Sequence, residues 1–254
     1  IVDFILKEKL NPLIIIVNNH FLTNLAWHNI HNLITYYDLD AVTYSPEINI
    51  YKSLIRSSLV KFNDIYWPYR YLNQSYTLQV AIEKEIPLII WGGYQPIEFV
   101  GKFSHKDKVE MSEWSLTEHD LHGQNLNLFM STGSRFNENK FLKYPNYETC
   151  KNVRGIYLSN YLRWDPWEQN SRFKSQGFLG ELSKHTFDIY ENVGSSTYYQ
   201  IHDLLRIEKY GYKKVREQLS REIRHERISR DKALNLYELY LNQQYDVHDF
   251  FNWL

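Results

Sequence analysis

The chain of 254 residues contains a single cysteine, Cys150. One cysteine cannot form an internal disulfide, nor can it alone build a zinc cluster or a redox pair, so a reducing, cytoplasmic setting is expected. Long apolar runs are also lacking. The longest, Leu13–Val17 and Pro87–Trp91, are far shorter than the roughly 20 residues that a membrane helix needs. A net charge of −1 argues against nucleic-acid binding. We therefore predict neither membrane insertion nor a nucleic-acid partner.

The residues that are present suit a large folded core, with 43% hydrophobic and 16% aromatic residues. The first half alternates helical and strand-like patterns, which favours an α/β fold with a doubly wound, mostly parallel sheet. Strands are predicted at 13–17, 40–44 and 86–91. Helices are predicted at 1–10, about 25–36, from Pro46 to about 60, and about 75–85, with an aromatic loop over 64–71. No strand precedes the first helix, so we expect the N-terminal domain to be incomplete.

The second half reads differently. A polar stretch follows Gly123, and a helical pattern runs from about residue 196 almost to the end. Ser229 is predicted to be an N-cap, Gly211 a C-cap, and Asp246 the start of a last short helix. We therefore predict an α/β domain over 1–123, a polar insertion over 124–152 and a mainly helical region for substrate or partner over 153–254.

Two predicted strands end in polar or glycine-rich sequence. Asn18 and Asn19 follow the strand at 13–17, and Gly92-Gly93 ends the strand at 86–91 and leads to Gln95. Ligands of open α/β sheets gather at the carboxyl ends of parallel strands, and glycine lets a backbone approach a ligand closely. The alternative is a pair of plain tight turns. We favour the rim of a ligand site.

Six ordered segments carry a resemblance to a known family: "IIWGGYQPIEFVGKFSH", "EHDLHG", "VRGIYLSNYLRWD", "FDIYENV", "HDLLRIEKYGY" and "SREIRHERISRDKAL". The chain resembles, over nearly all of its length, the N-acetyl sugar amidotransferases of flagellin-sugar and lipopolysaccharide O-antigen biosynthesis, which include the pseudaminic and legionaminic acid amidotransferases. The resemblance implies the ATP-pyrophosphatase fold, an adenine-nucleotide hydrolase-like α/β sheet with a helical C-terminal part.

The same resemblance implies a reaction. ATP, with Mg²⁺, would adenylate the amide oxygen of an acetamido sugar, free or nucleotide-linked, and release pyrophosphate. Ammonia would then displace AMP and leave an acetamidino group. A glutaminase subunit of the histidine-biosynthesis type, with a cyclase-like channelling subunit, would deliver the ammonia. Water must be excluded, since it would hydrolyse the activated intermediate.

Two departures from the family pattern bear on activity. The pyrophosphate loop Ser-Gly-Gly-Lys-Asp-Ser, expected just before Ile1, is not in this sequence, so we do not expect this polypeptide alone to hydrolyse ATP well. Many relatives carry Val-Asp-Asn where this chain has Val17-Asn18-Asn19, and they carry cysteines near the Trp-Pro pair, which in this chain is followed by Tyr69 and Tyr71. Any metal role of those cysteines is lost, and no metal site is predicted.

The resemblance also suggests roles for individual residues, each of which has a simpler alternative. Arg163 and Asp165 could form an ion pair that holds a loop, His202 could be a core histidine, and Arg221 and Arg224 could lie on a solvated charged face. The predicted catalytic residues are Asp165 and His202. The predicted nucleotide-binding residues are Asn18, Asn19, Trp91, Gly92 and Gln95. The predicted substrate-binding residues are His119, Asp120, Arg163, Tyr212, Arg221 and Arg224.

Three functions remain in competition. The first is the ATP-dependent sugar amidotransferase. The second is a non-catalytic remnant or scaffold of that family, which the missing loop favours. The third is a tRNA-modifying ATP-pyrophosphatase, against which the single cysteine and the net charge of −1 argue. We predict the first.

Overall fold

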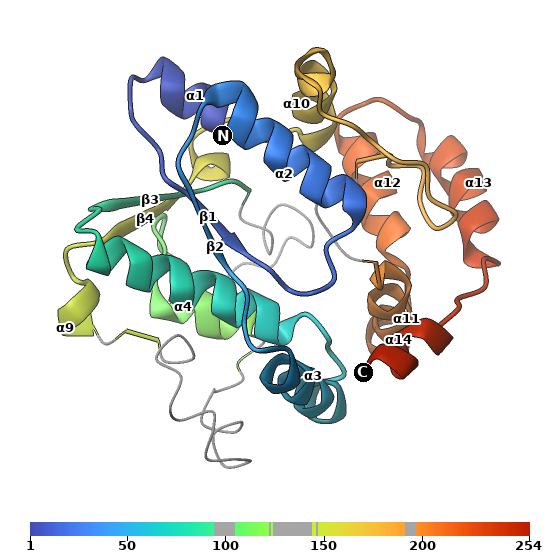
Figure 1. Cartoon of the computed structure of the whole chain (residues 1–254). Helices are drawn as coiled ribbons and strands as arrows, with labels where there is room; N and C mark the ends of the chain where they lie inside the picture. The colour runs from blue at the N-terminus through green and yellow to red at the C-terminus, as the bar shows by residue number, and fades with distance from the viewer. Residues whose placement is uncertain (94–104, 122, 124–143, 146, 191–196) are drawn as a thin grey trace. The chain divides into compact units, whose positions relative to one another are not determined.

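The computed structural model describes residues 1–93, 105–121, 123, 144, 145, 147–190 and 197–254 (Figure 1). The chain divides into two compact units, each made of segments that are separate in sequence. Unit 1 comprises Ile1–Asn19, Leu39–Lys61 and Tyr66–Trp164, and unit 2 comprises His20–Asp38, Phe62–Ile65 and Asp165–Leu254. The domain bounds predicted from the sequence assign a function to each part of the chain. The division into two compact units does not test those assignments.

Unit 1 contains parallel strand pairs of the kind that the sequence predicts. Strand β1 (Ile14–Val17) pairs with β2 (Ala41–Tyr44), and β3 (Leu88–Trp91) pairs with β4 (Arg154–Tyr157). These pairs establish a mixed α/β structure with small parallel sheets. In the part of the chain that the structure describes, each sheet has two strands, so a doubly wound sheet stays a prediction.

Unit 1 also contains helices and short helical turns. They are α1 (Val2–Lys7), α3 (Ile48–Phe62), α4 (Trp67–Glu83), the short α6 (Glu113–Ser115), the π-helix η1 (Leu116–Asp120), α9 (Tyr147–Cys150) and the 3₁₀ turn η3 (Leu158–Asn160). Helix α3 begins at Ile48, so Pro46 precedes it and does not form its first turn as predicted. Helix α4 contacts β1, β3, η1 and α9, which makes it the central helix of the unit.

The aromatic stretch at the start of α4 was predicted to be a loop, and that prediction is wrong. Trp67 and Tyr71 lie four residues apart, on one helix face, and their rings stack with centroids 5.8 Å apart. Both side chains are buried. Pro68 is compatible with this helix because it lies in the first turn, where its missing N–H has no intrahelical partner to lose. Aromatic burial therefore extends the helix to Trp67.

Unit 2 is mainly helical, as predicted for the C-terminal region. It contains α2 (Asn24–Tyr37), α10 (Pro166–Arg172), the 3₁₀ turn η4 (Phe173–Gln176), α11 (Tyr199–Tyr210), α12 (Lys214–Arg224), α13 (Arg230–Leu241) and α14 (His248–Trp253). The predicted caps at Ser229 and Gly211 are confirmed. The Ser229 hydroxyl accepts from the Lys232 N–H at 3.3 Å, and Gly211 ends α11 at φ +77°. Asp246 lies just before α14, whose N-cap is Val247.

Helix α2 is built into unit 2 by specific hydrogen bonds. The Asn29 side-chain amide donates to the Leu179 carbonyl and accepts from the Leu179 N–H, both at 2.9 Å. Just before α2, the Phe21 carbonyl accepts from both the N–H and the hydroxyl of Thr197. The Phe21 ring lies edge-on to Tyr198 and Trp253 and is 1% exposed. The C-terminal helices therefore form their core together with a segment from near the N-terminus.

No helix among the described residues is long and apolar enough to cross a membrane.

Candidate functional site

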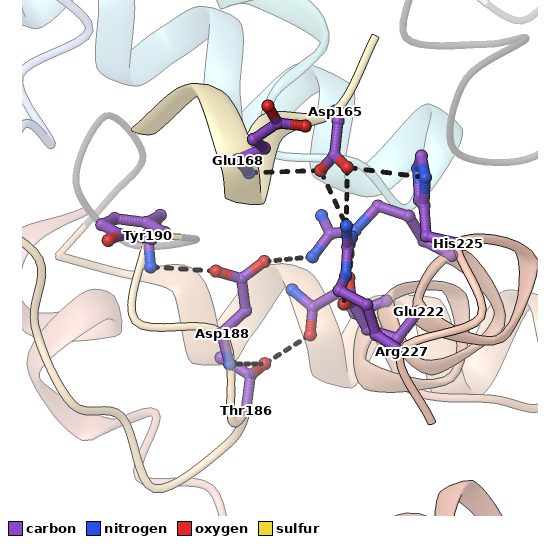
Figure 2. Close-up of polar contacts among 10 residues, drawn as sticks. Asp165, Glu168, Thr186, Asp188, Tyr190, Glu222, His225 and Arg227 are labelled. Atoms are coloured by element: carbon purple, nitrogen blue, oxygen red, sulfur yellow. Dashed lines mark hydrogen bonds and ion pairs between the residues drawn. The ribbon is translucent and has the colours of Figure 1, made fainter. Parts of the chain in front are cut away.

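Among the described residues of unit 2, a chain of ion pairs joins several charged side chains, most of them buried (Figure 2). Its members come from three places: the start of α10, the segment between η4 and residue 191, and the end of α12 with the turn that follows it. We call this group the charge cluster: Asp165, Asp188, Arg221, Glu222, His225 and Arg227.

Asp165 closes one end of the charge cluster. It is the N-cap of α10, where its Oδ1 accepts from the Glu168 N–H at 3.2 Å and Pro166 occupies the first helical turn. The guanidinium of Arg227 donates to both carboxylate oxygens, at 2.6 Å and 3.2 Å. Burial opposes ionisation of Asp165, but the hydrogen bonds from Arg227 and Glu168 outweigh it and lower the pKa of the carboxyl below its ordinary value. Asp165 is therefore held as a carboxylate.

Glu222 joins the two arginines in the middle of the cluster. Its carboxylate accepts from the Arg221 Nε at 2.8 Å and from Nη2 and Nε of Arg227. Burial again opposes ionisation, but the hydrogen bonds from the two arginines lower the pKa of Glu222. Arg221 in turn donates to Asp188 at 2.6 Å. The result is a continuous path from Asp188 through Arg221, Glu222 and Arg227 to Asp165.

Arg227 is the most exposed member of this path, with 29% of its side chain accessible, but the other four members are buried, unlike those of a surface charge run. Asp165, Asp188, Arg221 and Glu222 are each no more than 5% exposed. Removing one partner of such a buried pair leaves an uncompensated charge in a medium of low dielectric constant, which destabilises the fold strongly. The geometry can therefore fix the positions of Asp165 and of the α12 terminus with little freedom.

The predicted catalytic and substrate-binding residues of the C-terminal region are only partly brought together. Asp165 and Arg221 both belong to the charge cluster, whereas Tyr212 donates its hydroxyl to Glu217 at 3.3 Å. His202 is half-buried on α11, and Arg224 is exposed on α12. Arg163 is exposed and belongs to unit 1. Their roles in binding or catalysis stay predictions.

At the end of β3, the glycines face an indole ring of the protein itself. A Cβ at Gly93 would lie 2.7 Å from Nε1 of Trp164, and a Cβ at Gly92 would lie 3.0 Å from the same ring. Trp91, predicted to contact nucleotide, donates from its Nε1 to the Met111 sulfur at 3.2 Å. The close approach that the glycines were predicted to offer a ligand is thus used by Trp164. Gln95 lies outside the described residues.

At the end of β1, the two predicted nucleotide contacts have different surroundings. The Asn18 amide donates to the Ser45 hydroxyl at 3.1 Å, and Asn19 is 2% exposed. Both belong to the polar end of a parallel strand pair, since the Asn18 N–H donates to the Tyr44 carbonyl at 2.8 Å. Their contact with a nucleotide stays a prediction.

His119 and Asp120, predicted to bind substrate, lie on the π-helix η1 and contact different partners. His119 Nε2 lies 2.5 Å from Asp107 Oδ1, with both side chains buried. Asp120 accepts from the Gln74 amide at 2.6 Å. The described residues include no group of three or more histidine, cysteine or acidic side chains that could hold a metal ion.

The sequence analysis singled out neither Asp188, Glu222, His225 nor Arg227. Two signals were available, because Asp188 lies in "FDIYENV" and the other three in "SREIRHER", two of the segments that carry the family resemblance. The pattern alone could not show that these charges are buried against one another, since the partners come from different parts of the chain.

The comparisons with known proteins bear on this same region. Residues 184–254 match the family described as "LPS biosynthesis protein WbpG-like, C-terminal domain". No curated protein matches the chain. The match spans less than a third of the chain but includes five of the six members of the charge cluster. It supports a relation of this chain to a family connected with lipopolysaccharide biosynthesis.

Proposed function

We propose that the protein takes part in lipopolysaccharide or related surface-sugar biosynthesis as an ATP-dependent amidotransferase, which converts an acetamido group of a sugar to an acetamidino group. The observation that carries the proposal is the match of residues 184–254 to the WbpG-like C-terminal domain. The six-segment resemblance of the whole chain to the N-acetyl sugar amidotransferases supplies the reaction type.

The chemistry explains what such a protein must provide. An amide oxygen is a poor leaving group, and transfer of AMP to it makes displacement by ammonia feasible. The reaction then needs a group that accepts a proton from the attacking nitrogen, and an environment that excludes water. The buried, preorganised charge cluster of unit 2 is a candidate for the proton-handling part.

ATP with Mg²⁺ is proposed as a substrate. The face of Gly92 and Gly93 is covered by Trp164, and Asn18 is hydrogen-bonded to Ser45. Contact of these residues with a nucleotide stays a prediction. The ammonia source is proposed to be a separate glutaminase, and the site of action the cytoplasm.

These same contacts favour a second candidate, a scaffold of the family that has no ATP chemistry. The two are separated by incubating the protein from the complete reading frame with ATP, Mg²⁺, isotope-labelled ammonia and nucleotide-linked acetamido sugars. An amidotransferase releases pyrophosphate and transfers the label to a sugar amidine seen by mass spectrometry. A scaffold does neither, but binds the acetamido sugar or a glutaminase in a pull-down.

A further inference from the structure

The two strand pairs of unit 1 each leave a backbone edge open. Strand β1 pairs with β2 and β3 pairs with β4, and in the part of the chain that the structure describes β1 and β3 pair with no further strand. No residue of β1 or β3 is exposed, however, whereas β2 exposes Ala41 and Thr43. Strands β1 and β3 therefore have the burial of central strands but the pairing of edge strands.

The N–H groups along the open edge of β1 follow from its pairing with β2. Successive residues of a strand direct their backbone N–H groups to opposite edges. The N–H groups of Ile14 and Asn18 donate towards the β2 side, to carbonyls at 2.9 Å and 2.8 Å. Those of Ile15 and Val17 therefore point to the open edge. Val17 is 3% exposed, and buried N–H groups are nearly always paired with an acceptor.

The same alternation gives the open edge of β3. The Arg154 N–H of β4 donates to the Pro87 carbonyl at 2.8 Å, so the residues that face β4 alternate from Pro87 onward. The two N–H groups between them point away from β4. We call these two, together with those of β1, the open-edge donors: the N–H groups of Ile15, Val17, Leu88 and Ile90. No described residue accepts a hydrogen bond from them.

Helix α4 limits the width of the space between β1 and β3. It contacts both strands, and the two strands do not pair with each other (Figure 1). Paired strands lie about 4.8 Å apart, so two strands with one strand between them lie about 10 Å apart. A helix with its side chains is about 10–12 Å across, and one helix can therefore cover β1, β3 and one strand between them.

The start of α1 shows from which direction such a strand arrives. A Cβ at Gly92 would lie 2.7 Å from Cδ1 of Ile1, and Gly92 directly follows β3. Ile1 therefore lies at the carboxyl end of β3. From there α1 and its connection lead to β1 over residues 1–13, and a crossover between parallel strands needs about a dozen residues. A strand whose carboxyl end lies next to Ile1 runs parallel to β1 and β3.

We propose that the residues just upstream of Ile1 in the complete reading frame form a parallel strand between β1 and β3. It joins the two pairs into one five-stranded sheet with the order β2, β1, added strand, β3, β4. Its carbonyl oxygens accept from the open-edge donors on both sides. A strand at the centre of a parallel sheet is buried on both faces, so this segment is a run of apolar residues. It belongs to the fold of unit 1 and does not depend on the proposed reaction.

The direct test uses the wild-type protein from the complete reading frame. Scalar couplings across hydrogen bonds, measured by NMR, identify the carbonyl that accepts from each open-edge donor. We expect the acceptors of β1 and of β3 to lie in one segment upstream of Ile1. Three results would each overturn the proposal: acceptors elsewhere in the chain, acceptors on a second copy in a sample of mixed isotope labels, or no acceptors at all.

Hydrogen exchange in the same protein gives a second readout with an internal control. The Asp40 carbonyl accepts from the Ile14 N–H, so Ala41 and Thr43 direct their N–H groups to the outer edge of β2. The open-edge donors should exchange as slowly as the Ile14 N–H, within about tenfold, because one sheet opens as a unit. The N–H groups of Ala41 and Thr43 should exchange far faster. Equally fast exchange at both edges would contradict the added strand.

Matched proline substitutions test the same edge through stability. Proline lacks an N–H and is tolerated in a strand where that position faces no partner strand. Thr43→Pro changes the outer edge of β2 and should keep the urea midpoint near that of the wild type. Ile15→Pro removes an open-edge donor and should lower the midpoint well below that of Ile15→Ala, which keeps the N–H and shortens the side chain. Equal midpoints for the two Ile15 variants would show that the edge of β1 is free.

Discussion

One arginine pair of unit 1 and the charge cluster of unit 2 place the same residue types in contrasting surroundings. In unit 1, Arg154 pairs with Glu110 at the surface, with their side chains 66% and 38% exposed, and the glycines at the end of β3 are covered by an aromatic ring. In unit 2, Arg221 and Arg227 are locked into a chain of buried carboxylates. Similar residue types are therefore exposed to solvent in the one place and largely shielded from it in the other. Matched substitutions, one in each unit, test this difference through the free energy of unfolding.

The largest effect is expected from Arg221→Met. The substitution leaves Asp188 and Glu222 buried with one counter-charge fewer, and removal of one partner from a buried ion pair typically costs about 3–5 kcal/mol. The free energy of unfolding, measured by urea denaturation, should fall by that order. Arg154→Met, the matched control in unit 1, removes an exposed pair and should have little measurable effect. Equal losses in the free energy of unfolding of the two variants would show that burial of the charge cluster does not increase its contribution to stability.

Features that depend on residues close together in the sequence were predicted, and features that depend on distant residues were not. Ser229 and Gly211 act within one helical turn, and both were predicted correctly. The burial of Arg221 depends on Asp188, more than thirty residues earlier, and on Asp165, earlier still, through Arg227. No periodic pattern encodes such a meeting. The helix at Trp67 was missed for a related reason, because aromatic residues next to proline suggest a loop until their burial partners are known.

The second effect concerns the end of β3 in unit 1. A Cβ at Gly93 would lie 2.7 Å from the Trp164 indole, a rigid group that cannot yield without repacking. Gly93→Ala should therefore lower the free energy of unfolding by about 1–3 kcal/mol, the usual cost of overpacking. In a Trp164→Leu background the same substitution should cost much less, and the double-mutant cycle measures that coupling. Additive effects would mean that the glycine does not serve this contact.

A third effect should be alike in both units, because helix caps act locally. The Ser229 hydroxyl caps α13 in unit 2, and the Ser112 hydroxyl accepts from the Ser115 N–H at 3.1 Å in unit 1. Replacing either serine with alanine removes one hydrogen bond to a helix N–H, worth about 1 kcal/mol. Thermal unfolding of the two variants should give similar losses. A loss several times larger at Ser229 would indicate that unit 2 is sensitive at every position, and not only in its charge cluster.

The smallest effect is a dependence on pH that belongs to unit 2. Burial lowers the pKa of His185 from its ordinary 6.5, and the charges of Lys213 and Lys184 add to this although Asp203 opposes it. The ring stacks on Tyr245 with centroids 4.9 Å apart. Because the folded state binds the proton less readily than the unfolded chain, the stability from this group is complete above pH 6.5. It declines as the pH falls through that value towards the lowered pKa. His185→Gln should flatten this part of the stability profile in urea titrations, and an unchanged slope would place the pH dependence elsewhere in the unit.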